Sequence, residues 1–330
     1  MRRLKISLAC IVTMAALSSG ACLAQNPGEV FPVKPVTLVV PFAAGTTITD
    51  IESRLYAQKL SEGFGGRPVL LDFRAGAGGM IGALFVAKSV PDGYTVLGAS
   101  GATIIAPLMQ KNPLYDPARD FTPLAQMTTR TNLLVVHPSL PARSVAEYIA
   151  YARANPGKVN FSTPGTGSGP HLGGAWLHRA TDTTVTFISY KGTAPAMTDL
   201  VSGRIQASIG SYSSMAPQVS AGKLRLIGVT GEERLDLVPD IPTIAEQGVP
   251  GYNYSNWFGI VGPAGMPRPV VIRLNAELNR ISSNPEVVKK MAAENSKSVS
   301  GSTPEQFRAL IATETSRWQQ VIRDAGITPE

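Results

Sequence analysis

Two loops rich in small and hydroxyl-bearing residues have the composition of an anion site. The first runs from Phe42 to Thr47, between an apolar run and a helical pattern, and the second runs from Thr163 to His171. A loop that leads from a strand into a helix leaves backbone N–H groups without partners, and the helix dipole places positive potential beside them. Because the loops hold the same place in two successive units, we expect them to face each other across a cleft and bind a molecule with a carboxylate at each end. An ordinary strand–helix connection is the alternative for either loop alone.

Ser100 suggests a different chemistry. The segment Gly98-Ala-Ser-Gly-Ala102 differs at one position from the G-x-S-x-G nucleophile turn, and it follows an apolar run. A hydrolase of that kind needs a histidine after the serine, and His171 is the available candidate. An exported serine hydrolase using Ser100 is therefore the alternative function.

Nucleotide, metal and nucleic-acid sites are not predicted. The third glycine of G-x-G-x-x-G is replaced by Ile81 after Gly76 and by Pro170 after Gly165. Three histidines and two cysteines show no metal-ligand spacing. The net charge of +7 is scattered along the chain and not clustered. We therefore expect no cofactor, no metal and no nucleic-acid partner.

The N-terminus has the pattern of a cleavable export signal. Three basic residues precede the apolar segment Ile6–Leu17, and small residues lead to a predicted cleavage after Ala24. Cys10 and Cys22 would both be removed, so the mature chain would depend on its core and not on disulfides. Retention and lipidation of Cys22, which ends a loose lipoprotein-like box, is the alternative.

The rest of the chain predicts an α/β fold with two lobes. Strands at Val36–Pro41, Val69–Phe73 and Tyr94–Ala99 alternate with helices, and a second such series runs from Val159 to Gly210. Thr49 and Glu52 have the spacing of a capping box, which predicts a helix start near Asp50. The predicted divisions are a signal peptide at 1–24, a first lobe at 25–130 and 257–330, and a second lobe at 131–256.

Many ordered motifs add a family resemblance along nearly the whole mature chain. They include Val40-Pro-Phe-Ala-Ala-Gly45, Arg74-Ala-Gly-Ala-Gly-Gly79, Pro91-Asp-Gly-Tyr-Thr95, Tyr190-Lys-Gly192, Pro239-Asp-Ile-Pro-Thr243 and Trp257-Phe-Gly259. With these motifs the chain resembles the Bug-type periplasmic substrate-binding proteins of tripartite tricarboxylate transporters. The resemblance implies the two-lobed type II periplasmic-binding-protein architecture, with a mostly parallel sheet in each lobe and a ligand, mostly a carboxylate, between them.

The resemblance also implies the site. Its ligand-binding residues here would be Phe42, Ala43, Ala44, Gly45, Thr46, Thr47, Ser100, Thr163, Gly165, Thr166, Gly167, Ser168, His171, Tyr190 and Ser211. The sequence departs from the family pattern at Thr46–Ile48, where a second glycine is lost and a residue added, and at Ala175, where a glutamate is common. Neither loop contains an arginine, so we expect recognition mainly by neutral donors.

The sequence thus predicts a monomeric periplasmic receptor and not an enzyme. It would bind a small organic acid, with an aliphatic or aromatic dicarboxylate favoured, and deliver it to the permease subunits of a tripartite tricarboxylate transporter. Hydroxy-acids and acidic amino acids are compatible too. A receptor that signals to a sensor kinase is a further alternative.

Overall fold

A computed structural model describes residues 31–44, 48–190 and 192–327 of the chain. The predicted export signal and its cleavage point lie outside these ranges, as do Gly45, Thr46 and Thr47. Within the described ranges no helix is both long and apolar enough to cross a bilayer.

The first strand group contains three parallel strands and two longer antiparallel ones. Its order is β2-β1-β3-β9-β4, and β10 pairs with β4. The strands are β1 (Val36–Val40), β2 (Val69–Phe73), β3 (Thr95–Ser100), β4 (Phe121–Val136), β9 (Ser255–Pro263) and β10 (Lys297–Ser298). The helices that follow β1, β2 and β3 are α1 (Ile48–Gly63), α2 (Met80–Ala87) and α3 (Gly101–Leu108).

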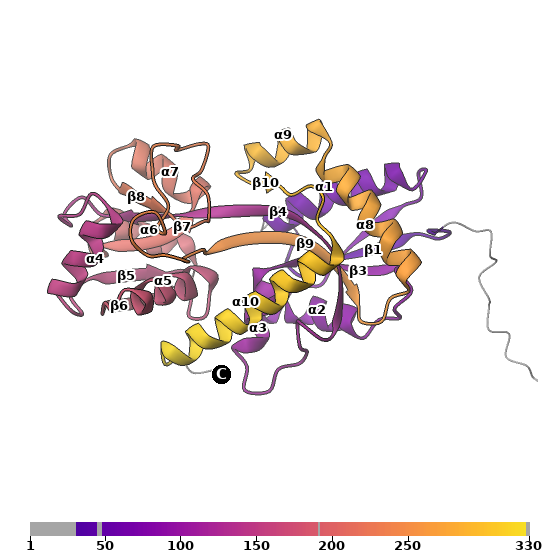
Figure 1. The fold of residues 1–330 in the computed structure, drawn as a ribbon, viewed down its shortest axis with the longest axis horizontal. Coiled ribbons are helices and arrows are strands. Elements are labelled where there is room, and N and C mark those ends of the chain that lie inside the picture. Colours follow the sequence, from indigo (N-terminus) through magenta and orange to yellow (C-terminus); the bar gives the residue numbers. More distant parts are fainter. Residues whose placement is uncertain (1–30, 45–47, 191, 328–330) are drawn as a thin grey trace, which may run out of the picture.

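The second strand group continues from the far end of β4. From Asn132 onward, β4 pairs with β7 and β8, and β7 leads to β5 and β6. Its elements are α4 (Val145–Ala154), β5 (Asn160–Thr163), α5 (Gly169–Ala180), β6 (Thr186–Ser189), α6 (Thr193–Val201), β7 (Ala207–Ser211), α7 (Tyr212–Ser220) and β8 (Arg225–Val229). Figure 1 shows β4 and β9 running between the two groups of helices and strands.

The N-terminal part of β4 departs from the sequence prediction. The sequence predicts a strand at Leu133–His137, preceded by a break in the strand–helix pattern from Pro113 to Pro123, whereas β4 begins at Phe121. The pairing with β9 shifts register between Pro123 and Ala125, and again between Gln126 and Thr128. Such bulges accommodate a proline inside a paired strand. The helix α7 and the strand β10 were also not predicted.

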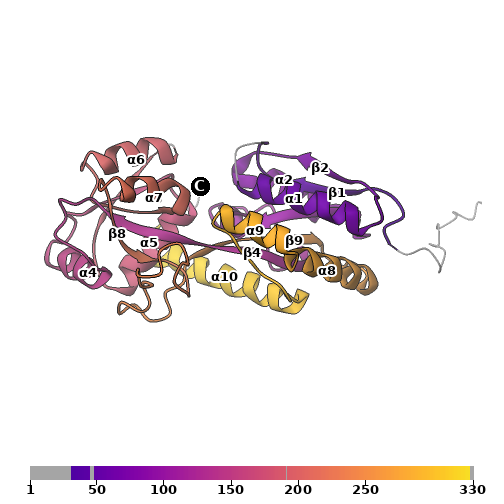
Figure 2. The same ribbon diagram turned by 90° about the horizontal axis from the view of Figure 1, so that it is seen from above.

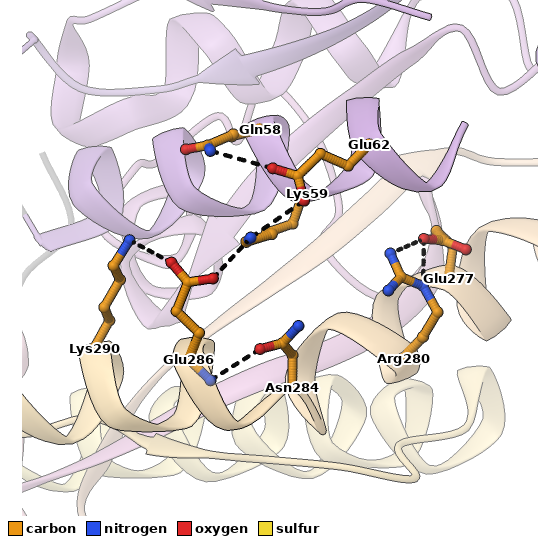
Figure 3. Close-up of polar contacts among 8 residues, drawn as sticks. All are labelled: Gln58, Lys59, Glu62, Glu277, Arg280, Asn284, Glu286 and Lys290. Atoms are coloured by element: carbon orange, nitrogen blue, oxygen red, sulfur yellow. Dashed lines mark hydrogen bonds and ion pairs between the residues drawn. The ribbon is translucent and has the colours of Figure 1, made fainter. Parts of the chain in front are cut away.

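The C-terminal helices cover the first strand group and extend beyond it. They are α8 (Arg268–Ser282), α9 (Pro285–Ala293) and α10 (Pro304–Asp324), of which α9 was not predicted. The Lys59 ammonium of α1 pairs with Glu286 of α9 at 2.9 Å and with Glu62 at 3.2 Å (Figure 3). The last helix contacts α3, α5 and β4, and in Figure 2 it runs along the molecule beside β4. One helix therefore touches both strand groups.

Two predicted helix starts have different outcomes. The Ser-x-x-Glu spacing of Ser144 and Glu147 predicts a helix cap, and the Ser144 hydroxyl accepts a hydrogen bond from the Glu147 N–H at 3.1 Å, which confirms this cap of α4. The capping box of Thr49 and Glu52 is wrong, because α1 already begins at Ile48. The Glu52 carboxylate is fully buried and bonds to Thr128 and Arg130 instead.

A buried histidine lies in the core of the second strand group. His178 is 4% exposed, and its ring packs against Phe161. Its Nε2 lies 3.2 Å from the Tyr148 hydroxyl oxygen and its Nδ1 lies 2.8 Å from the Thr183 hydroxyl oxygen. Burial disfavours the charged imidazolium and lowers the pKa of His178 to about 3. The imidazole is therefore neutral at physiological pH.

We expect the free energy of unfolding to fall as the pH drops below about 6.5. The folded-state pKa of His178 lies below its unfolded-state pKa, so protonation favours the unfolded chain. The loss approaches about 1.4 kcal/mol per pH unit for this histidine. Urea unfolding at a series of pH values measures the slope. His178→Gln should remove this contribution, and His137→Gln, at a partly exposed position, is the matched control. An identical slope in His178→Gln and the unaltered protein would contradict the assignment.

Candidate functional site

A cavity of about 580 Å³ lies where the two strand groups meet. The first strand group contributes Phe42 and the start of α3 at Ser100, and the second contributes the loop from Thr166 to Pro170. The crossing strands add Arg130 of β4 and Trp257 of β9. Residues that lie far apart in the sequence, from Phe42 to Trp257, thus line one cavity of mixed polar and apolar character.

The loop before α5 is held by its own side chains. The Ser168 hydroxyl donates to the Gly165 carbonyl at 2.7 Å and accepts from the His171 N–H at 3.4 Å, so Ser168 is the N-cap of α5. The Nδ1 atom of His171 accepts from the Gly167 N–H at 2.9 Å. This fixes the conformation of a loop in which Gly167 has φ +72°, a value that L side chains rarely adopt.

His171 supports the loop and does not line the cavity. The residue is 8% exposed, and its ring packs edge-on against Phe187 at 5.0 Å between centroids. Burial lowers the pKa of His171, which favours the neutral ring that the Nδ1 acceptor role requires. The sequence predicts His171 as a ligand-binding residue; in the structure its Nδ1 is occupied by the Gly167 N–H, and the residue is not among those that line the cavity.

The fifteen residues predicted for binding are distributed unevenly around the cavity. Five of them line it: Phe42, Ser100, Thr166, Gly167 and Ser168. Ser211 lines a smaller cavity beside it. Gly45, Thr46 and Thr47 lie outside the described residues. The other six do not appear in either lining: Ala43, Ala44, Thr163, Gly165, His171 and Tyr190.

Two of those six have hydroxyl groups that bond elsewhere. The Tyr190 hydroxyl donates to the Asp199 carboxylate at 2.7 Å, and desolvation together with this partner raises the pKa of Tyr190 to about 12. The Thr163 hydroxyl donates to the Gly165 carbonyl at 3.4 Å. The first interaction links the chain after β6 to α6, and the second lies within the loop that follows β5.

Arg130 is the charged residue that the sequence analysis missed. It lines the cavity, and its Nη1 donates to Glu52 Oε1 at 2.9 Å and to the Ser296 hydroxyl at 3.2 Å. The same Glu52 oxygen accepts from the Thr128 hydroxyl at 2.5 Å. Glu52 is fully buried and the Arg130 side chain is 13% exposed. This ion pair ties α1 to β4 directly beneath the cavity.

A weak signal for Arg130 was present in the sequence. Thr128, Arg130 and Asn132 stand at alternate positions just before the predicted strand at Leu133. Alternate residues of a strand share one face, so extending the strand toward the N-terminus would have placed all three together. The run of threonines around them hid the alternation between polar and apolar residues.

No histidine is placed to activate Ser100. The backbone N–H of Ser100 donates to the Thr103 hydroxyl at 3.1 Å at the start of α3. Of the three histidines, all within the described ranges, none lines the cavity. The ring of His137 bonds to Ser139, and those of His171 and His178 bond as described above. In the described part of the chain, no group of histidine, cysteine and acidic residues is arranged to hold a metal.

Residues 53–327 match the family described as the tripartite tricarboxylate transporter family receptor. The chain belongs to this family. The resemblance predicted from the sequence motifs is therefore confirmed. Members of this family are substrate-binding receptors of transporters and not enzymes, and hydrolysis at Ser100 is not part of such a function.

Relatives and solved structures agree with the family. The chain is 37% identical to a Pseudomonas sp. (strain P51) protein from the tcbD-tcbE intergenic region, covering 93% of this chain and 90% of that protein. An R. palustris protein solved with adipate has a TM-score of 0.74 at 36% identity, and the match covers 91% of this chain and 100% of that protein. MatC from Rhodopseudomonas palustris, solved with bound malate, has a TM-score of 0.70 at 31% identity, and the match covers 88% of this chain and 100% of that protein. The receptor has the mixed α/β fold of these periplasmic binding proteins.

We expect Glu52→Ala to lower the free energy of unfolding by about 3–5 kcal/mol, because it leaves the largely buried Arg130 charge without its partner. Chemical denaturation measures the change. Glu286→Ala is the matched control, since Glu286 also pairs with a cation from a neighbouring helix but is exposed. Equal effects of the two substitutions would show that the buried pair is not a major stabilising contact.

Proposed function

We propose that this receptor binds a small organic dicarboxylate in the 580 Å³ cavity, in the periplasm, and delivers it to membrane permease subunits of a tripartite transporter. The main support for this proposal is that the N-terminal ends of two helices line the cavity: α3, which follows the first strand group's β3, and α5, which follows the second strand group's β5. The family membership supports the transport role. The adipate and malate in related structures support the ligand class.

The electrostatics of the cavity favour an anion. The helix ends at Ser100 and Ser168 contribute positive potential and backbone donors. The described lining residues include no aspartate or glutamate, and the one cation among them is Arg130. Since Glu52 already compensates the Arg130 charge, most of the recognition falls to neutral donors, as the sequence predicts. Apolar side chains such as Met80, Ile105 and Trp257 suit the carbon chain of an acid.

The loop at Phe42–Thr47 belongs to the proposed site as well. Phe42 lines the cavity on one side of Gly45–Thr47, and Thr49 lines it on the other. We therefore retain Gly45, Thr46 and Thr47 as ligand contacts in the proposal. The loss of a second glycine there would let threonine hydroxyls assist the backbone donors.

Binding would act by closing two lobes around the acid. The first lobe would comprise residues 25–130 with 257–330, and the second residues 131–256. The ligand shifts the population toward the closed form by the difference in its affinity for the two forms. One helix N-terminus contributes only about 0.3–1 kcal/mol for an exposed anion and about 2 when partly buried. Closure would therefore be needed to exclude water and complete the hydrogen bonds.

We expect adipate to stabilise the mature protein against heat and hexanoate to do so much less, because hexanoate has one carboxylate at the same chain length. At 100 times its dissociation constant a ligand adds about 2.7 kcal/mol to the free energy of unfolding, which gives a clear rise in melting temperature. Succinate and suberate with butyrate and octanoate extend the comparison. Absence of a shift with every carboxylate would exclude the proposed ligand class.

We expect Gly167→Ala to lower the affinity for the best diacid by about tenfold or more. A Cβ at Gly167 would lie 2.9 Å from Met109 Cε, so the methionine side chain would have to shift, and with it the shape of the cavity that both residues line. Gly157→Ala is the matched control, because Gly157 has φ +73° and nothing within 4 Å of its Cβ position. Calorimetric titration of both variants measures the effect. Equal losses would mean that backbone strain, and not the cavity, is responsible.

A further inference from the structure

A second, smaller cavity opens next to the first. It has a volume of about 170 Å³ and shares Pro170 and Asn256 with the larger cavity. Its walls come from β4, β5 and β7 of the second strand group and from the starts of α6 and α7. A molecule in the larger cavity could therefore extend one end into this recess of polar and apolar side chains, defined here as the β4–β5–β7 pocket.

Two fully or almost fully buried polar groups line this pocket without hydrogen-bond partners in the described part of the chain. Ser162 is 0% exposed and Asn132 is 3% exposed. Neither the Ser162 hydroxyl nor the Asn132 Nδ2 amide has a partner among the described residues. Buried polar groups are nearly always satisfied, and an unsatisfied one requires an explanation. A ligand group that accepts both hydrogen bonds supplies that explanation.

The surroundings specify the charge of the ligand group. Thr193 begins α6 and Ser211 is the N-cap of α7, and both residues line the pocket. Each helix has nine residues, and each N-terminus adds positive potential. The described lining residues carry no formal charge. An amide N–H₂ can only donate, so a cationic ammonium would be rejected and a carboxylate accepted.

We propose that the β4–β5–β7 pocket receives the second carboxylate of the ligand, with Ser162 and Asn132 as its hydrogen-bond donors. The pocket then determines the preference for diacids over monoacids. Met197 and Met215 in its walls pack against the carbon atoms next to that carboxylate. This inference rests on the proposed function, and it assigns the far end of the acid to residues outside the loops Phe42–Thr47 and Thr163–His171.

The test compares Ser162→Ala with Ser53→Ala by calorimetric titration with adipate and hexanoate. Ser53, on α1, is also 0% exposed with a hydroxyl that has no partner in the described structure, but it lines neither cavity. We expect Ser162→Ala to weaken adipate binding about tenfold, as for loss of a hydrogen bond to a charged group. Hexanoate binding should stay within about twofold, and Ser53→Ala should change neither. The melting temperature of ligand-free Ser162→Ala should match that of Ser53→Ala, since neither loses a hydrogen bond.

A second variant, Asn132→Asp, tests the same pocket independently in case Ser162→Ala fails to fold. Asn132→Asp keeps the shape and the acceptor for the Asn256 amide, which lies 3.4 Å away, but it places negative charge in the pocket. It should abolish adipate binding at neutral pH and spare hexanoate.

Equal losses for adipate and hexanoate, or no loss for either, would overturn the assignment while the receptor function stands. A preference of the unaltered protein for hexanoate would overturn it too. If the unaltered protein binds none of the carboxylates, the proposed function itself fails, and the pocket assignment fails with it.

Discussion

The site depends on one strand, β4, which is paired in both strand groups. Thr128, Arg130 and Asn132 stand at alternate positions of this strand and so share one face. Thr128 bonds to Glu52 of α1, Arg130 lines the larger cavity, and Asn132 lines the smaller one. A register slip of one residue would move all three to the opposite face. Because Arg130 and Asn132 stand on the same strand, β4 fixes the position of the larger cavity relative to the smaller one.

The Glu52–Arg130 ion pair places a cation in the lining of the larger cavity. Because the buried Glu52 carboxylate compensates that charge, the net charge around the cavity stays small. Removing two ions from water costs several kcal/mol each, and the pair is sustained by the extra bonds from Thr128 and Ser296. What remains for an anionic ligand is a set of helix ends and neutral donors. Each contributes little, so tight binding needs many of them together and the exclusion of water. This suits a receptor that must also release its ligand.

Local sequence patterns predicted the parts of the fold that depend on local physics. The parallel strands β1, β2 and β3 follow from their apolar runs, and the cap at Ser144 follows from its spacing to Glu147. The capping box at Thr49 failed because a tertiary partner, Arg130, competes for Glu52. The hydrogen bond from the Gly167 N–H to His171 Nδ1 could not be predicted from the sequence, because it depends on how the loop folds back on α5. Asn132 and Ser162 line the same pocket because β4 and β5 both pair with β7, which is a long-range arrangement that local patterns do not reveal.

A crystal structure of the mature receptor with its tightest-binding diacid would locate both carboxylates of the ligand. We expect one carboxylate in the larger cavity, near Ser100 and the loop from Thr166 to Gly169. We expect the other carboxylate in the β4–β5–β7 pocket, within hydrogen-bond distance of the Ser162 hydroxyl and the Asn132 amide. A diacid bound outside these cavities, or one with both carboxylates in the larger cavity, would contradict this placement.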